Sequence, residues 1–147
     1  MRTSSRWAAA AACLLLSGCV APALDSGAFQ QNAIGALDSA VSTSRVAALA
    51  LDARVRDRIT PAYADTLVTE AEEAIGPVEA SFGSVDPPDP TLDELRKAVL
   101  DQLGDTGDLL AEARIAVRRG DTHAMATLVG DLRRVADSMD QHAEALQ

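Results

Sequence analysis

The C-terminal end of the chain has the most constraining pattern in the sequence. Apolar residues and one histidine recur there at alternating spacings of three and four: Met125, Leu128, Leu132, Val135, Met139, His142 and Leu146. This spacing places side chains on one stripe of an α-helix. An apolar stripe is stable only when it is buried against other elements, so residues 122–147 predict one helix of a larger helical assembly.

Three earlier segments repeat the pattern. Their stripes are Ile34, Leu37, Val41, Ala48, Leu51 and Val55 in 29–59, Ala64, Leu67, Ala71, Ala74, Val78 and Phe82 in 61–82, and Leu92, Leu95, Val99, Leu103, Leu110, Ala113 and Val117 in 92–119. No segment alternates between apolar and polar residues as a strand would. We predict an all-α fold, an up-down-up-down antiparallel four-helix bundle over residues 29–147. The alternative is two long helical hairpins that associate as a dimer.

Two connections between the helices are tight. Thr60-Pro61 suits a helix start, because threonine is a good N-cap and proline is favoured at the first helical position. Gly120 suits a helix end, and Asp121 suits the N-cap of the next helix. Short connections of this kind place consecutive helices antiparallel.

Two further signals concern the middle of the chain. Residues 83–90 hold three prolines and two aspartates and predict a loop. After it, Thr91 and Glu94 have the spacing of a capping box. Before it, Gly76-Pro77 predicts either a kink or the end of the second helix, because proline removes a helical hydrogen bond.

The N-terminus has the features of a secretion signal. Residues 1–6 include two arginines, and the apolar run that follows is about ten residues long, half of what a bilayer span needs. This is typical of a signal peptide. The run ends in Leu16-Ser17-Gly18-Cys19, which resembles the lipobox of bacterial lipoproteins.

The lipobox resemblance implies removal of residues 1–18 and a diacylglyceryl group on Cys19, with residues 19–28 as a tether between lipid and bundle. Two acyl chains hold a protein on a membrane. Ordinary signal cleavage after 21–23, Ala-Pro-Ala, is the alternative. With Cys19 carrying the lipid, the mature chain would lack any free thiol that could act as a nucleophile or form a disulfide.

Composition fits an envelope protein. Arginine outnumbers lysine twelve to one, and alanine and aspartate are abundant, which is similar to small uncharacterised actinobacterial helical lipoproteins. That likeness implies the extracytoplasmic face of the cell membrane, although a diderm host would leave the outer membrane open. The net charge of −9 argues against nucleic-acid binding, which requires a basic face.

The residues that could carry chemistry lack the required spacings. Neither His123 nor His142 has the glutamate three residues earlier that di-iron bundles use. No Gly-x-Ser-x-Gly elbow is present. Gly104 and Gly107 do not form a phosphate-binding motif and are interpreted as structural. We therefore expect no enzyme, no metal and no cofactor.

Charge is distributed unevenly along the predicted bundle. Removal of residues 1–18 leaves a net charge of −11, of which residues 54–65 and 112–123 carry +2 and the remainder −13. The predicted topology brings these two segments, here called the arginine end, to the end of the bundle far from the tether. Its arginines are Arg54, Arg56, Arg58, Arg114, Arg118 and Arg119.

These six arginines have two interpretations. Cations stabilise helix C-termini, which alone would place most of them. Alternatively, they bind an anionic wall polymer or an acidic envelope protein.

The sequence thus predicts a non-enzymatic, lipid-anchored binding or scaffolding module of the cell envelope. The alternative is a carrier of small apolar ligands, or an envelope chaperone, with a cleft between helices lined by Leu, Val and Met. The breaks at Gly76-Pro77 and at Gly104 and Gly107 would be the hinge or mouth of this cleft.

Overall fold

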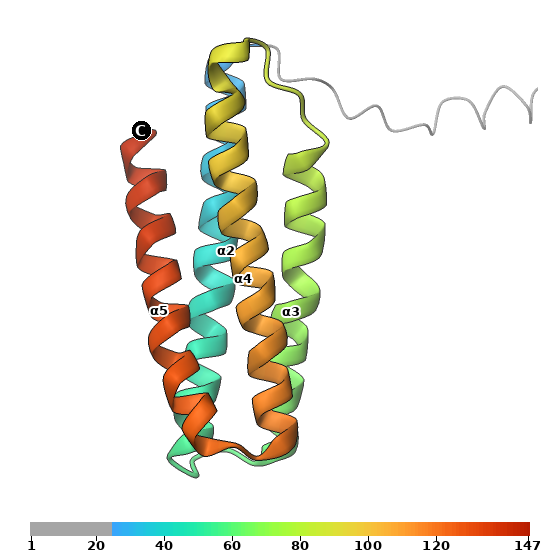
Figure 1. Cartoon of the computed structure of the whole chain (residues 1–147), viewed down its shortest axis with the longest axis vertical. Coiled ribbons are helices and arrows are strands. Elements are labelled where there is room, and N and C mark those ends of the chain that lie inside the picture. The colour runs from blue at the N-terminus through green and yellow to red at the C-terminus, as the bar shows by residue number, and fades with distance from the viewer. Residues whose placement is uncertain (1–24) are drawn as a thin grey trace, which may run out of the picture.

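The computed structural model describes residues 25–147, so the predicted signal peptide, Cys19 and most of the tether lie outside the described residues. The elements are α2 (Ser26–Val55), α3 (Pro61–Gly83), the 3₁₀ turn η2 (Pro90–Leu92), α4 (Asp93–Arg119) and α5 (Thr122–Ala145). The four long helices lie side by side and run alternately up and down (Figure 1). The predicted all-α four-helix bundle is confirmed.

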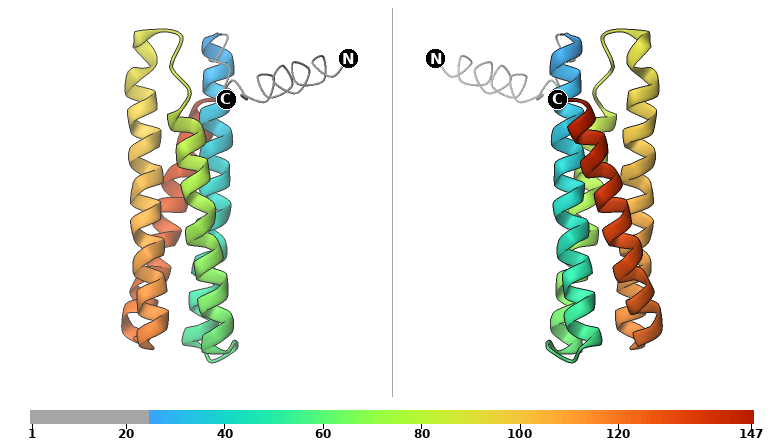
Figure 2. Two further views of the ribbon diagram at one scale, coloured as in Figure 1. Left: turned by 90° about the vertical axis from the view of Figure 1, so that its right-hand side faces the viewer. Right: turned by 90° about the vertical axis from the view of Figure 1, so that its left-hand side faces the viewer.

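The helices contribute unequally to the packing. Helix α2 contacts α3, α4 and α5, and its most extensive contact is with α5. Figure 2 shows α5 inclined across α2. The diagonal pair α2 and α4 meet, whereas α3 and α5 make almost no contact within the described chain. The contact between α2 and α5, the first and last of these helices, therefore closes the bundle.

The predicted stripes form most of the core, but in α3 Ala74 is exposed and Val68 and Ile75 are buried instead. The largest fully buried apolar side chains of the core come from all four helices: Phe29, Leu37, Leu51, Val68, Val99, Leu103, Leu110, Met125, Leu132 and Met139. Ser44 and Thr106 stand where two of the stripes lack an apolar residue, and both side chains are buried. Thr106 Oγ1 donates to the carbonyl of Gln102 at 2.8 Å, whereas Ser44 Oγ has no partner among the described residues.

Both tight connections form as predicted. Thr60 Oγ1 accepts a hydrogen bond from the Tyr63 amide at 3.2 Å and caps α3. Gly120 ends α4 with φ 66°, in the left-handed region that favours glycine. Asp121 then accepts from the Ala124 amide at 2.9 Å and caps α5.

The first helix is displaced from its predicted bounds. Asp25 accepts from the Ala28 amide at 2.8 Å, so α2 begins at Ser26 and takes residues 26–28 from the predicted tether. It ends at Val55 rather than near Ile59. Asp57, with φ 53°, turns the chain there.

The predicted segment 61–82 agrees with α3, which continues through Pro77 to Gly83, so of the two alternatives at Gly76-Pro77 the helix end is excluded. Pro77 is exposed, as is Glu73 one turn earlier, so water can solvate the carbonyl that loses its hydrogen bond. Ile75 and Phe82, on either side of the proline, are buried in the core and hold the helix together.

The predicted capping box is wrong. Asp89 accepts from the Thr91 amide at 2.8 Å and caps the turn η2. Leu92 is then the N-cap of α4 and makes no side-chain cap. Pro90 explains the difference, since its fixed φ favours a helical turn that starts one residue before Thr91.

Candidate functional site

The arginine end forms as the topology requires. The C-termini of α2 and α4 both lie at the end of the bundle opposite Asp25 (Figure 1). All six predicted arginines are therefore at or near one end. The structure divides them into four that form ion pairs and two that do not.

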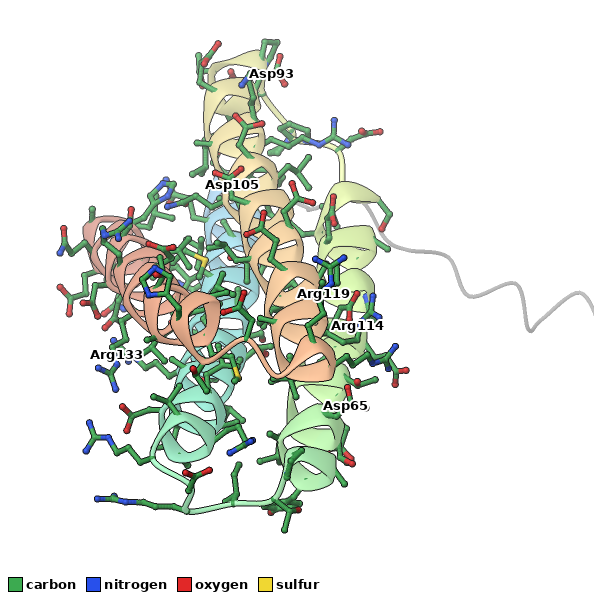
Figure 3. All side chains as sticks on the ribbon, turned by 60° about the horizontal axis from the view of Figure 1, so that its bottom comes forward. Asp65, Asp93, Asp105, Arg114, Arg119 and Arg133 are labelled. Carbon is green, nitrogen blue, oxygen red and sulfur yellow. The ribbon has the colours of Figure 1, made fainter. Side chains whose placement is uncertain are left out.

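Two arginines join α4 to α3. Arg114 forms a bidentate pair with Glu72, with Nη2 3.1 Å from Oε1, and both side chains are about one quarter exposed. The hydrogen bonds that Arg114 donates to the Glu72 carboxylate raise the pKa of its guanidinium. Arg118 Nε donates to Asp65 at 2.8 Å. Figure 3 shows Arg114 on the same side of the bundle as Asp65.

Two arginines form pairs close to the end of α2. Arg54 Nη1 lies 2.5 Å from Asp57 Oδ1, and Arg56 Nη2 lies 3.0 Å from Asp52 Oδ1. Asp52 and Glu72 lie outside the two segments that define the arginine end. Their two negative charges cancel its net charge of +2, so simple attraction of a polyanion to this end is weak.

Arg58 and Arg119 form no ion pair within residues 25–147, and each lies beside an exposed apolar side chain. Arg58 lines a shallow groove with Ile59 and Tyr63, whose side chain is 54% exposed. Arg119 lines another groove with Ile115, which is 41% exposed. Each arginine thus lies beside apolar surface without an ion pair among residues 25–147, although Asp57 also lines the first groove and Glu112 and Asp121 line the second.

Sequence reasoning missed two residues at this end, Tyr63 and Ile115. Both lie off the apolar stripes, which was the signal that could have marked them as exposed. Arg133, on α5, forms no ion pair among the described residues, and Figure 3 shows it pointing away from Arg114 and Arg119. It therefore belongs to a different side of the molecule.

The two histidines differ in their contacts. His142 Nδ1 lies 2.7 Å from Gln102 Oε1 and links α5 to α4, whereas His123 is exposed in the first turn of α5. Residues 25–147 hold no group of three His, Cys, Asp or Glu side chains placed to bind a metal ion.

An uncharged groove runs between α2 and α3. It is about 430 Å³ in volume and open to solvent, and Gln31, Asn32, Pro77, Val78 and Phe82 are among its lining residues. The structure thus places the predicted Gly76-Pro77 mouth at a groove. Gly104 and Gly107 lie on α4 and do not line it.

Helix α2 is the one described helix long and apolar enough to cross a membrane. Its most apolar window has a mean hydropathy of 1.2, and 56% of that window is buried inside the bundle. Contacts with three other helices account for much of this apolar surface.

Comparisons of the chain with protein families, with curated proteins and with solved structures found no match.

Proposed function

We propose that this chain is a non-enzymatic, lipid-anchored module of the cell envelope that binds an acidic partner protein through its arginine end. The observation that supports this is the placement of Arg58 and Arg119. Each is free of ion pairs among the described residues and lies beside an exposed Tyr63 or Ile115.

This combination favours a protein partner over a polymer. Arginine and aromatic side chains are enriched at the centres of protein interfaces, where apolar contact accompanies charge pairing. An anionic wall polymer would depend on excess positive charge, which Asp52 and Glu72 cancel. We therefore treat polymer binding as the competing outcome.

The test compares two double variants of the full chain that lose the same charge. Arg58→Gln with Arg119→Gln removes the free guanidinium groups, and Arg56→Gln with Arg118→Gln removes paired ones of similar exposure. Titration with a peptide that alternates glutamate and leucine, which offers both charge and apolar contact, should show about a tenfold weaker affinity for the first variant, about 1.4 kcal/mol. The matched control should change much less.

The same titration with anionic wall polymer separates the alternatives. If both double variants bind the glutamate–leucine peptide as the parent does, the arginine end is not the binding site. If the polymer binds and the peptide does not, the partner class is wrong.

The anchor is tested separately by Cys19→Ala and membrane fractionation. Loss of the diacylated cysteine should move the protein from the membrane to the soluble fraction, since two acyl chains supply the anchoring. Continued sedimentation of the Cys19→Ala chain with membranes would contradict lipidation at this residue.

The groove between α2 and α3 supports carriage of a small apolar ligand as a second candidate function. Its volume is in the range of small-molecule sites, and its lining carries no charge. Val78→Trp would fill the groove and should abolish binding of a fluorescent apolar dye. Unchanged dye binding would exclude this groove as the site.

A further inference from the structure

A groove lies between α4 and α5 on the outside of the bundle. At one end of it the two helices are linked, because His142 Nδ1 lies 2.7 Å from Gln102 Oε1 and Gln102 Nε2 lies 3.5 Å from Ser138 Oγ. Beyond this link the helices leave a hollow of about 640 Å³ that is open to solvent. This α4–α5 groove is larger than the groove between α2 and α3.

The α4–α5 groove has an apolar floor and a charged rim. Leu109 of α4 and Val135 of α5 line it, and both are half-buried because they pack against the hydrophobic core. Asp105, Asp108 and Glu112 are exposed along its α4 side. A surface of this kind accepts an amphipathic helix, whose apolar face lies in the groove while its polar flanks meet the rim.

The charge of the rim is not balanced inside the described chain. On the α5 side, Asp131 pairs with Arg134 at 2.6 Å. On the α4 side, Asp105, Asp108 and Glu112 form no ion pair within residues 25–147. Like charges three and four residues apart repel each other and destabilise a helix. The three unpaired carboxylates therefore have a cost to stability that bound cations would relieve.

We propose that the α4–α5 groove binds a cationic amphipathic helix of a partner protein. The three carboxylates are spaced three and four residues apart, so they extend over about 10.5 Å at 1.5 Å per residue. Lysine or arginine residues on three successive turns of a helix extend over about 10.8 Å, which matches the carboxylates. Three residues on one face of an extended strand extend over about 13.6 Å, which does not. Apolar side chains between the cations of the helix then cover Leu109 and Val135.

This partner differs from the acidic partner of the arginine end in charge and in place. Figure 3 shows Asp105 on α4 between Asp93 and Arg119. Asp105 and Asp108 both lie outside the two segments that define the arginine end. The negative net charge of the chain also attracts a cationic partner over a distance. The protein thus has one surface for each sign of charge.

Fluorescence anisotropy with the full chain tests the groove. The probe is a labelled, stapled helix with leucine on one face and lysine on both flanks. Asp105→Asn with Asp108→Asn should weaken its binding about tenfold. The matched control is Glu70→Gln with Glu79→Gln, which removes the same charge from exposed positions on α3. This control should change the affinity much less.

Thermal unfolding separates a binding role of the aspartates from a structural one. Asp105→Asn with Asp108→Asn removes like-charge repulsion, so the thermal midpoint should rise while binding of the peptide weakens. A lower midpoint together with weaker binding would assign the aspartates to the fold and overturn the site.

Three further outcomes would overturn the proposal. Absence of binding to the parent chain would exclude the site. Equal weakening by the two double variants would show general attraction to an acidic protein. Equally tight binding of a second peptide, with serine in place of leucine, would show that the apolar floor takes no part. The arginines are unchanged in every variant, so these outcomes are independent of the test of the proposed function.

Discussion

The two ends of the bundle use charge differently. At the end where α2 begins, Asp25 and Asp89 act within their own turns, where they accept hydrogen bonds from the amides of Ala28 and Thr91. At the arginine end, Arg114 and Arg118 reach across to another helix. In the sequence, these acidic residues lie near helix starts and these arginines lie near helix ends, as the helix dipole favours. Of these four residues, only Arg114 and Arg118 connect helices.

The largest expected effect tests the backbone of the arginine end. Gly120→Ala should destabilise the bundle by about 1–2 kcal/mol, because a side chain is strained at φ 66° even though open space surrounds the new methyl group. Gly104→Ala is the matched control in the same helix. It also meets open space, and helix propensity predicts stabilisation by about 1 kcal/mol. Denaturant unfolding measures both, and equal signs would contradict this explanation.

The next effect concerns the acidic caps. Asp25→Ala should destabilise the protein by about 1 kcal/mol through loss of the α2 N-cap, with faster hydrogen exchange of the Ala28 amide. Asp25→Asn keeps an acceptor oxygen and should behave like the parent. A similar loss with Asn would show that Asp25 acts by its charge rather than by its hydrogen bond.

A smaller effect separates the arginine pairs from one another. A double-mutant cycle with Glu72→Gln and Arg114→Gln should give a larger coupling energy than one with Arg54→Gln and Asp57→Asn. Both side chains of the first pair are largely covered, whereas Asp57 is 87% exposed and screened by water. Equal coupling in the two cycles would remove the distinction between pairs across helices and pairs within one turn.

The smallest effect is the pH response of Asp89. The hydrogen bonds from the Thr91 backbone and side chain hold the pKa of its carboxyl below the ordinary value. A depressed pKa in the folded state adds stability above the unfolded pKa, and this is lost as the pH falls through the folded value. The Thr91 amide shift in an NMR titration should therefore move at a pH below that of an ordinary aspartate, and Asp89→Asn should abolish the step.

Sequence reasoning succeeded where local chemistry decides the structure. Thr60, Gly120 and Asp121 set their turns with residues close by in the chain, and the stripes supplied most of the core. At Pro77 the sequence left a kink and a helix end open, because the burial of Ile75 and Phe82 that outweighs the loss of one hydrogen bond is a tertiary effect. Sequence reasoning failed at Thr91. Either Asp89 or Thr91 could accept the capping hydrogen bond, and Pro90 favours the helical turn that Asp89 caps.

The candidate site was only partly predictable for a different reason. The positions of the six arginines follow from topology, but their pairing does not. Whether Arg114 reaches Glu72 depends on the rotation and relative height of α3 and α4, which the spacing of residues along one helix does not determine. The same rotation left Tyr63 and Ile115 exposed beside Arg58 and Arg119.

The extensive contact between α2 and α5 has a consequence for biosynthesis. A ribosome makes the chain from its N-terminus, so α2 emerges long before the helix that covers it. Contacts that join distant parts of a chain form late and slow its folding. The bundle therefore stays open until the last helix is synthesised.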